Sequence, residues 1–364
     1  MINVAAICKN EEKFIVRFLD HVKDADSICI VDTGSTDSTI QLIETWCAAH
    51  PDVAVNILLD DGPRNLGRSR SMAASMFPQD QLVVWLDIDE YFSDPNWCAV
   101  LRDLNPMGPV YIEMHNGDSH YFQLKAYFKD QHFWKYAAHE VLVEQGHPAP
   151  RTSVQTFHTV HTPDRTKQRD YLPELAYDAT RYANDPRASF YYCRELCYSV
   201  IYGQGSLEEA EAEYRRLMAM NPWADYKALA SIEMIGAQYA RDKLDIQTIY
   251  SAIAARPDRV ESYAFGSWTI YQYGDYITAL SLAIQGISAA DRPSNFLFSS
   301  VRTNLEMCLD VARYACVQLN MEQQAVFYHG RLCVIRNEDP TEWMEQNNVL
   351  NKVPANGESK ETDA

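Results

Sequence analysis

Apolar segments alternate with amphipathic segments over the first quarter of the chain. The apolar runs are short, are rich in isoleucine and valine, and occupy residues 2–8, 27–31, 53–59 and 82–86. Between these runs, apolar residues recur at the spacing of a helix face. The predicted helices cover residues 14–22, 40–46 and 65–77. Strands that alternate with helices predict a parallel sheet, whose ligand crevice forms at the carboxyl ends of its strands.

Polar residues follow each predicted strand. They are Lys9 to Glu11, then Asp32, then Asp60 and Asp61, and finally Asp87, Asp89 and Glu90. Ionised carboxylates as close as the last three repel one another unless a cation, a sugar hydroxyl or a basic side chain lies between them. Mg²⁺ or Mn²⁺ is the commonest solution, because such an ion takes one or two carboxylates plus the oxygens of a bound diphosphate. Alternation along an extended segment would point Asp87 and Asp89 the same way.

Three motifs, in order, resemble the inverting family-2 glycosyltransferases of the GT-A fold. They are Cys-Lys-Asn-Glu-Glu at 8–12, Val-Asp-Thr-Gly-Ser-Thr-Asp at 31–37 and Leu-Asp-Ile-Asp-Glu at 86–90. Ala-His-Glu at 138–140 is similar to a His-Glu pair that follows the catalytic sheet in the tetratricopeptide-bearing branch of that family. The resemblance implies an α/β fold class: a GT-A, Rossmann-like sheet domain, followed by an all-α domain of tetratricopeptide-like repeats.

The resemblance also implies roles for individual residues toward a nucleotide-sugar donor. Asp32 would contact the base or ribose, Asp87 the ribose or the metal, and Asp89 the metal. Lys9, Glu11 and Arg70 would belong to the donor site as well. Two positions depart from the family pattern, because Ser71 replaces an asparagine and Lys125 stands where an arginine is expected. Structural alternatives stay open: Lys9 and Glu11 can pair with each other, and the residues around Gly34 can form only a turn and a helix cap.

Histidines are frequent between residues 110 and 143, with acidic residues among them. The histidines are His115, His120, His132 and His139, and the acids are Glu113, Asp118 and Glu140. Their spacing matches no zinc template and no cysteine lies nearby, so most are expected at the surface or in an acceptor cleft. The resemblance implies that His139 completes the metal shell or contacts diphosphate. An inverting transfer needs a carboxylate base, for which Glu140 is the candidate, with Glu113 and Asp118 as alternatives.

Prolines recur at a nearly constant interval in the second half of the chain. They are Pro186, Pro222, Pro257 and Pro293, spaced by 36, 35 and 36 residues. Residues 205–222 and 274–293 resemble the second-helix half of a tetratricopeptide unit, residues 242–257 are a degenerate copy, and 296–334 would cap the stack. The expected domains are therefore 1–165 for the sheet and 166–345 for the repeats, with a polar, disordered tail at 346–364. Tyr191 and Tyr263 are expected on the exposed concave face.

Composition narrows the class of protein. The net charge of −18 disfavours nonspecific attachment to nucleic acid or anionic lipid, because phosphate repels acidic surfaces. The nine cysteines lie mostly in apolar patterns and no signal peptide is evident, which favours a reducing cytoplasm. No apolar run approaches the roughly 20 residues that a membrane span needs, which predicts a soluble protein.

The sequence therefore predicts a metal-dependent, inverting glycosyltransferase that uses Mn²⁺ or Mg²⁺ and a nucleoside diphosphate sugar. UDP-hexose is the default donor through the resemblance, and the acceptor is expected to be a peptide or protein, or a saccharide. A modified base in phage DNA is a further alternative for the acceptor. A different class, an inactive repeat scaffold with a glycosyltransferase-like domain, also stays open.

Overall fold

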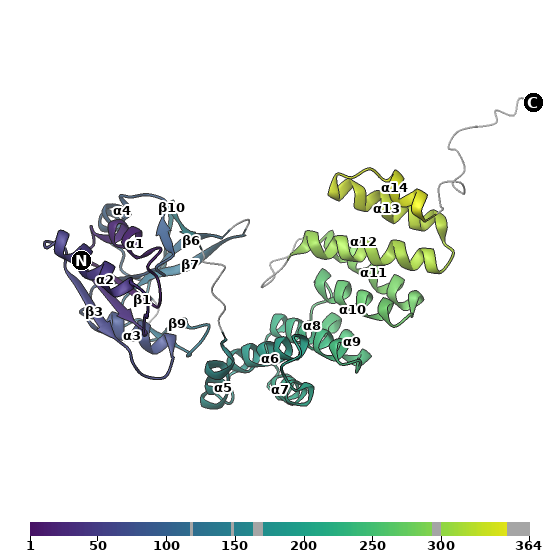
Figure 1. The fold of residues 1–364 in the computed structure, drawn as a ribbon, viewed down its shortest axis with the longest axis horizontal. Coiled ribbons are helices and arrows are strands. Elements are labelled where there is room, and N and C mark those ends of the chain that lie inside the picture. Colours follow the sequence, from purple (N-terminus) through teal and green to yellow (C-terminus); the bar gives the residue numbers. More distant parts are fainter. Residues whose placement is uncertain (117–118, 147–148, 163–169, 293–299, 348–364) are drawn as a thin grey trace, which may run out of the picture. The chain divides into compact units, whose positions relative to one another are not determined.

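The computed structural model describes residues 1–116, 119–146, 149–162, 170–292 and 300–347. The chain divides into two compact units, Met1–Arg181 and Tyr182–Ala364, here called the sheet unit and the helical unit. The predicted fold class, an α/β sheet domain followed by an all-helical region, is confirmed (Figure 1). The predicted boundary between residues 165 and 166 lies outside the described residues, as does the tail from 348.

The sheet unit contains an eight-stranded mixed sheet in the order β3-β2-β1-β4-β7-β6-β10-β5. The strands are β1 (Ile2–Cys8), β2 (Ser27–Asp32), β3 (Val55–Leu59), β4 (Leu82–Trp85), β5 (Glu90–Phe92), β6 (Val110–Asn116), β7 (Ser119–Tyr127) and β10 (Thr152–His161). The first four strands in this order pair in parallel, as predicted, whereas β7 runs antiparallel to both β4 and β6. A separate antiparallel pair joins β8 (His132–Lys135) to β9 (Val141–Glu144).

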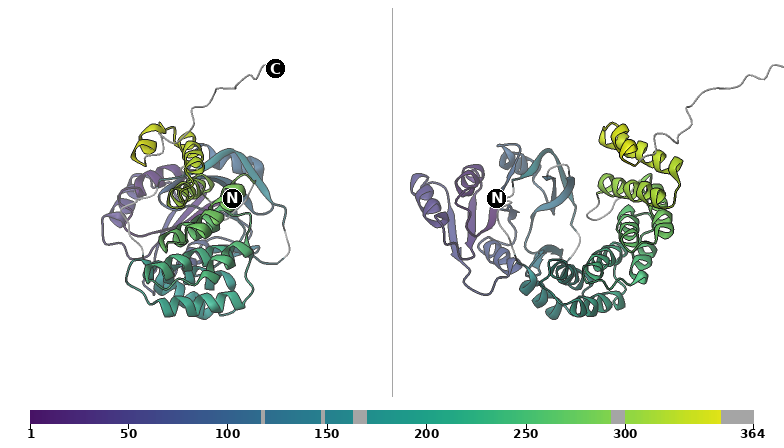
Figure 2. Two further views of the ribbon diagram at one scale, coloured as in Figure 1. Left: turned by 90° about the vertical axis from the view of Figure 1, so that its right-hand side faces the viewer. Right: turned by 45° about the vertical axis from the view of Figure 1, so that its right-hand side comes forward.

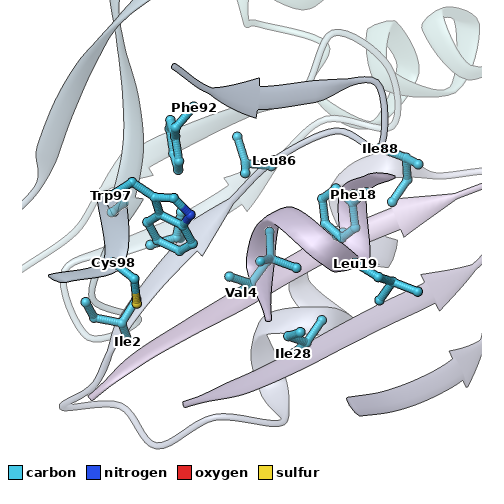
Figure 3. Close-up of a cluster of buried hydrophobic side chains, with 14 of the residues drawn as sticks. Ile2, Val4, Phe18, Leu19, Ile28, Leu86, Ile88, Phe92, Trp97 and Cys98 are labelled. Carbon is cyan, nitrogen blue, oxygen red and sulfur yellow. The ribbon is translucent and has the colours of Figure 1, made fainter. Parts of the chain in front are cut away.

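Helices cover both faces of the parallel strands. They are α1 (Ile15–Val22), α2 (Thr39–Ala49), α3 (Leu66–Ser75) and α4 (Trp97–Leu104). The helix α5 (Leu172–Arg181) also belongs to the sheet unit. Phe18 of α1 and Trp97 of α4 pack toward Val4 of β1 in one buried cluster (Figure 3). Ala73 of α3 and Trp134 of β8 pack on the other face of the sheet. Side chains buried on both faces explain why β1, β2 and β4 appear as apolar runs in the sequence. The edge strand β3 is also apolar, although Ile57 and Leu59 are exposed.

The helical unit is a row of packed helices (Figure 2). They are α6 (Pro186–Ile201), α7 (Leu207–Ala219), α8 (Ala224–Ala240), α9 (Ile246–Ala255), α10 (Val260–Gln272), α11 (Tyr276–Ala290), α12 (Val301–Gln318), α13 (Glu322–Arg336) and α14 (Thr341–Gln346). Each of α6, α8 and α10 contacts the helix that follows it and also the next even-numbered helix, an arrangement typical of helical repeats. Membership of the tetratricopeptide class stays a prediction.

The recurring prolines lie at helix boundaries. Pro186 begins α6, where the missing N–H costs nothing, and Pro222 and Pro257 lie in the turns before α8 and α10. Pro293 lies outside the described residues. The expectation that Tyr191 and Tyr263 are exposed was wrong: their exposed fractions are 6% and 5%. Among the described residues, no helix is both long and apolar enough to cross a bilayer.

Candidate functional site

The candidate site lies where the chain reverses its direction across the parallel sheet. The chain adds β2 and then β3 on one side of β1, and it returns to place β4 on the other side. In open α/β sheets, ligands bind at such a switch point, outside the carboxyl ends of the strands. Residues 9–11 after β1 and residues 87–89 after β4 flank this point, and Asp32 ends the neighbouring strand β2.

The Asp32 side chain is hydrogen-bonded within the turn that follows it. Its carboxylate, only 4% exposed, accepts hydrogen bonds from the backbone N–H groups of Gly34 and Ser35 at 3.1 and 3.0 Å and from the Ser35 hydroxyl. The backbone φ of +94° at Gly34 favours glycine, because a Cβ is disfavoured there. Burial first, and then the neighbouring Asp32 carboxylate, raise the pKa of the Cys8 thiol. Asp32 therefore shapes this turn, and its contact with a donor stays a prediction.

The loop after β1 is joined to the same turn. The Asn10 N–H donates to Ser35 Oγ at 2.9 Å, and the Thr36 N–H donates to Asn10 Oδ1 at 2.7 Å. The Glu11 N–H donates to Thr39 Oγ1 at 2.7 Å. Lys9 is exposed and Glu11 is buried. These bonds join the first two sequence motifs at the ends of β1 and β2.

The acidic motif forms a turn rather than the end of an extended strand. Strand β4 stops at Trp85, and the Glu90 N–H donates to the Asp87 carbonyl oxygen at 3.0 Å. The simple alternation predicted for Asp87 and Asp89 therefore does not apply. The Glu90 carboxylate turns inward, where it accepts from the Asp87 N–H at 2.9 Å and from Lys125 Nζ at 2.7 Å. Burial raises the pKa of Glu90 and lowers that of Lys125, while their ion pair opposes both shifts.

Arg70 of α3 connects Asp87 with Glu140. Its guanidinium donates to Asp87 at 2.6 Å and to Glu140 at 2.7 Å, and its carbon Cζ lies 4.8 and 5.0 Å from the ring centroids of Trp85 and Trp134. Burial lowers the pKa of Arg70, but the two carboxylates outweigh burial and hold that pKa above its ordinary value. The pKa of Asp87 is likewise raised by burial, but Arg70 outweighs this effect and keeps it below its ordinary value.

One atom of Arg70 is unsatisfied. Among the described residues, the buried Nη1 has no hydrogen-bond partner. A buried donor without a partner costs about 1–3 kcal/mol, so such atoms in native proteins need an explanation. A bound ligand oxygen would supply the missing acceptor.

Asp89 contacts His161 of β10. His161 Nε2 lies 3.3 Å from the Asp89 carboxylate, and this hydrogen bond raises the pKa of His161. The Thr162 N–H and hydroxyl both donate to the Asp89 carbonyl oxygen, at 3.0 and 2.7 Å. From the sequence alone, His161 belongs to the connector that follows the sheet, where a solvated linker is preferred and a contact with the diphosphate stays an alternative. The pairing of β10 with β5 brings His161 opposite Glu90.

His139 and Glu140 follow a loop that is held from two sides. The N–H groups of Ala137 and Ala138 donate to the Asp178 carboxylate of α5, which explains why α5 belongs to the sheet unit. The first turn of α3 packs so closely on this loop that a Cβ at Gly67 would lie 2.3 Å from the Tyr136 carbonyl oxygen. His139 has a backbone φ of +49°, and its ring lies 5.4 Å from that of Tyr171.

The predicted site residues are thus brought together only in part. The structure joins Arg70, Asp87 and Glu140 directly and places Asp89 in the same turn as Asp87. Within the described residues, His139 belongs to no group of three metal-ligating side chains. Sequence reasoning missed Trp85 and Trp134, and it noted Lys125 only as a departure from the family pattern.

A family model matches much of the sheet unit. Residues 4–141 match the model of the family described as Glycosyl transferase family 2. The match runs from β1 to the first residue of β9 and includes every site residue predicted from the sequence, from Lys9 to Glu140. It covers less than half of the chain and so characterises the sheet unit. No curated protein matches the chain.

Two solved structures illustrate the distant structural likeness. The mannosyltransferase PcManGT from Pyrobaculum calidifontis, in complex with GDP-Man and Mn²⁺, is 13% identical with a TM-score of 0.39, over 79% of this chain and 86% of that chain. S. aureus TarS 1–349, in complex with UDP, is 11% identical with a TM-score of 0.36, over 82% of this chain and 94% of that chain. These values are too low to carry any functional conclusion.

Proposed function

We propose that the protein transfers a hexose from a nucleoside diphosphate sugar to an acceptor, with inversion at the sugar's C1. The observation that carries this proposal is the buried Arg70, which links Asp87 at the switch point of the sheet to Glu140. Its Nη1 remains a hydrogen-bond donor without a partner among the described residues. The family match of residues 4–141 supports the same reaction class.

The donor would bind across the ends of β1, β2 and β4. Asp32 and Asp87 would accept hydrogen bonds from a base or ribose, for which Asp32 would have to give up part of its bonding to Gly34 and Ser35. Lys9 and Glu11 would belong to the same donor surface. The unsatisfied Nη1 of Arg70 would donate a hydrogen bond to an oxygen of the nucleotide sugar or of the acceptor substrate. Charge-assisted hydrogen bonds of this kind are about twice as strong as neutral ones. UDP is the proposed nucleotide.

Asp87 and Asp89 would hold the divalent cation, Mn²⁺ or Mg²⁺. Two carboxylates fit such an ion, which completes its shell with water and diphosphate oxygens. When bound, the cation supplies positive charge to the departing diphosphate. The side chain of Asp87 is 40% exposed although it is paired with Arg70. Asp89 would exchange its contact with His161 for a contact with the ion. His139 is a proposed additional ligand.

Glu140 is the proposed general base. An inverting transfer needs a carboxylate that takes the acceptor proton as the acceptor oxygen attacks C1. Arg70 orients this carboxylate through Glu140 Oε1, at a distance of 2.7 Å. Of the two alternatives, Asp118 lies outside the described residues, and the Glu113 carboxylate is paired with His115 Nε2 at 3.0 Å.

The acceptor is proposed to be a peptide, a protein or a saccharide that the helical unit helps to recognise. Arrays of helical repeats commonly bind extended chains. Aromatic side chains that could stack on such a chain are exposed on this unit, and they include Tyr202 at 76% and Trp223 at 57%.

The test is donor hydrolysis by the full-length protein. Purified protein is incubated with Mn²⁺ and a panel of UDP-, GDP- and dTDP-sugars, and release of the nucleoside diphosphate is measured. We expect slow hydrolysis of one donor, which disappears in Asp89→Asn and persists in Asp94→Asn, a matched acid in the following loop. If no nucleotide sugar is hydrolysed and none binds in calorimetry, the inactive scaffold is the better description.

A further inference from the structure

A second group of ligating side chains lies on the antiparallel part of the sheet. Glu113 and His115 are on β6, and His120 is on β7, directly opposite His115 in the strand register. His158 of β10 is paired with Glu113 on the other side of β6. Register partners share one face of a sheet, so these four residues, here called the histidine cluster, lie on a common face.

This face is opposite to the one that carries the contact with Asp89. His158 and His161 are three positions apart on β10, and successive side chains of a strand point to opposite faces. The register between β10 and β6 shifts only between Val154 and His158, so alternation holds from His158 to His161. His161 contacts Asp89, whereas His158 stacks on His115. The histidine cluster is therefore separate from the proposed donor site.

The spacing of the ligating atoms is that of a metal site. One atom each of Glu113, His115 and His120 lies within 4.8 Å of the other two. Glu113 Oε2 and His115 Nε2 are 3.0 Å apart. A tetrahedral Zn²⁺ with bonds of about 2.0–2.2 Å has ligand atoms about 3.3–3.5 Å apart. Movements of a few tenths of an ångström for this pair, and rotation of the exposed His120, would bring all three atoms to one ion.

The imidazole rings of the cluster are packed against one another. The rings of His115 and His158 are stacked with centroids 3.7 Å apart, and the ring of His120 meets that of His115 edge-on at 4.1 Å. A metal binds neutral imidazole and ionised carboxylate, so zinc binding at these residues would release any proton that they carry.

We propose that Glu113, His115 and His120 bind a first-row transition ion, with Zn²⁺ as the cation of choice. Two imidazole nitrogens and one carboxylate form a three-ligand set that leaves a fourth position for water. Imidazole ligands select zinc and its neighbours, whereas Mg²⁺ and Mn²⁺ favour carboxylate and phosphate oxygens. His158 would hold the His115 ring by stacking, and its Nδ1 lies 3.2 Å from Ser93 Oγ.

This site would join β6 to β7 near the end of their hairpin. The ligands come from a Glu-x-His pair on one strand and a single histidine on the next, so their proximity depends on the register of His115 with His120. Linear zinc templates do not contain this arrangement, which is why the spacing of the histidines matches none of them. Occupation by metal would also remove Glu113 as a rival to Glu140 for the role of base.

The test is zinc binding by the full-length protein after removal of metals with a chelator. Zn²⁺ is titrated at pH 7 against a chromophoric competitor, and Co²⁺ absorption is recorded as a probe of tetrahedral geometry. We expect one tight site per chain in the wild type, and at least a tenfold loss of affinity in His120→Ala and in Glu113→Gln. His120 is exposed, so its replacement should leave the fold intact.

His50→Ala, which removes a histidine at the end of α2, is the matched control and should keep the tight site. Zinc bound with the same affinity and stoichiometry by the wild type and the His120→Ala variant would overturn the proposal, because the ion would then occupy other histidines or cysteines. Absence of tight binding in the wild type would overturn it as well. Neither result depends on whether the protein hydrolyses a nucleotide sugar.

Discussion

Two groups of ligating residues on one sheet neutralise their charges in different ways. At the donor edge, defined by Arg70, Asp87, Asp89 and Glu140, a buried guanidinium already pairs with two of the three carboxylates. In the histidine cluster, one carboxylate faces imidazoles that are packed against one another. A cation at the donor edge must therefore compete with the Arg70 guanidinium, whereas the four residues of the histidine cluster include no lysine or arginine.

The difference suggests when each group would take up a metal. Burying a carboxylate has a desolvation cost, which its attraction to a buried cation such as Arg70 roughly offsets. Because Asp87 and Glu140 are already paired with Arg70 in this way, a divalent cation alone should gain little further attraction from them. A donor diphosphate brings negative charge to the same place, and binding of the cation and the donor should then support each other. The histidine cluster has no such requirement and would bind its ion in the absence of substrate.

Replacement of the proposed base should have the largest effect. Glu140→Gln keeps the size of the side chain and removes its basicity, so we expect turnover to fall by about 10²- to 10⁴-fold while donor affinity stays nearly constant. Turnover is measured as donor hydrolysis and affinity by calorimetry, with the more exposed Glu144→Gln as control. Zinc binding at the histidine cluster should not change.

A different outcome for Glu140→Gln would change its role. If donor affinity falls together with turnover, Glu140 acts by holding Arg70 and Asp87 and is a positioning residue. In that case all three carboxylates of the donor edge would serve to bind the nucleotide sugar and its cation, and none would act as the base.

Removal of the buried cation should cost stability. Arg70→Met would leave Asp87 and Glu140 without their partner, and breaking a buried pair in this way destabilises a protein by about 3–5 kcal/mol. Arg68→Met is the control, because Arg68 pairs with Asp60 while its side chain is 43% exposed, and exposed pairs contribute only about 0–1 kcal/mol. The free energy of unfolding is measured with urea. Equal losses in both variants would contradict the central role given to Arg70.

Asp89→Asn should separate the two metals. The substitution removes one of the two carboxylates proposed for Mn²⁺, so the gain in donor affinity on adding Mn²⁺ should shrink about tenfold, comparable to the loss of one charge-assisted bond of about 1.5–3 kcal/mol. Zinc affinity should stay at the wild-type value. The same response to Mn²⁺ in wild type and variant would place the cation elsewhere.

The sequence predicted the parallel strands and their polar ends because each depends on local patterns. The runs that became β1, β2 and β4 are continuously apolar, and Asp32 and Asp87 follow them directly. The partners of these acids could not be predicted in this way. Lys125 reaches Glu90 and His161 reaches Asp89 only through the pairing of distant strands, and the Trp85 and Trp134 rings around Arg70 meet through packing of β8 on the sheet.

In the helical unit, too, the sequence predicted local features but not the contacts between distant elements. The interval between prolines predicted helix boundaries, since proline cannot continue a helix. It did not predict which side chains the helices bury, and Tyr191 and Tyr263 proved to be core residues. Periodicity within one helix identifies an apolar face, but the neighbouring helices decide how much of the rest is covered.

The smallest expected effect is the pH dependence of stability that arises from His21 of α1. Unlike the histidines of the cluster, His21 is a single imidazole packed among core residues, and burial disfavours its protonation. Its Nε2 accepts from the Phe92 N–H at 2.9 Å, and its ring stacks on Trp97. Burial, followed by the charge of Arg17, lowers the pKa of His21 to about 4. Between pH 6.5 and 4 the unfolded chain therefore binds more protons at this residue than the native protein does, and stability falls as the pH falls.

Because the His21 ring is only partly buried, we expect its contribution to amount to about 1–2 kcal/mol over this range rather than the full linkage value. The free energy of unfolding is measured with urea at pH 6.5, 5.5 and 4.5 for the wild type and for His21→Gln, whose amide oxygen can still accept from the Phe92 N–H. The variant should lose less stability on acidification than the wild type. If both proteins lose the same amount, His21 is protonated as readily in the native state as in the unfolded chain, and burial alone does not keep an imidazole of this sheet unit neutral.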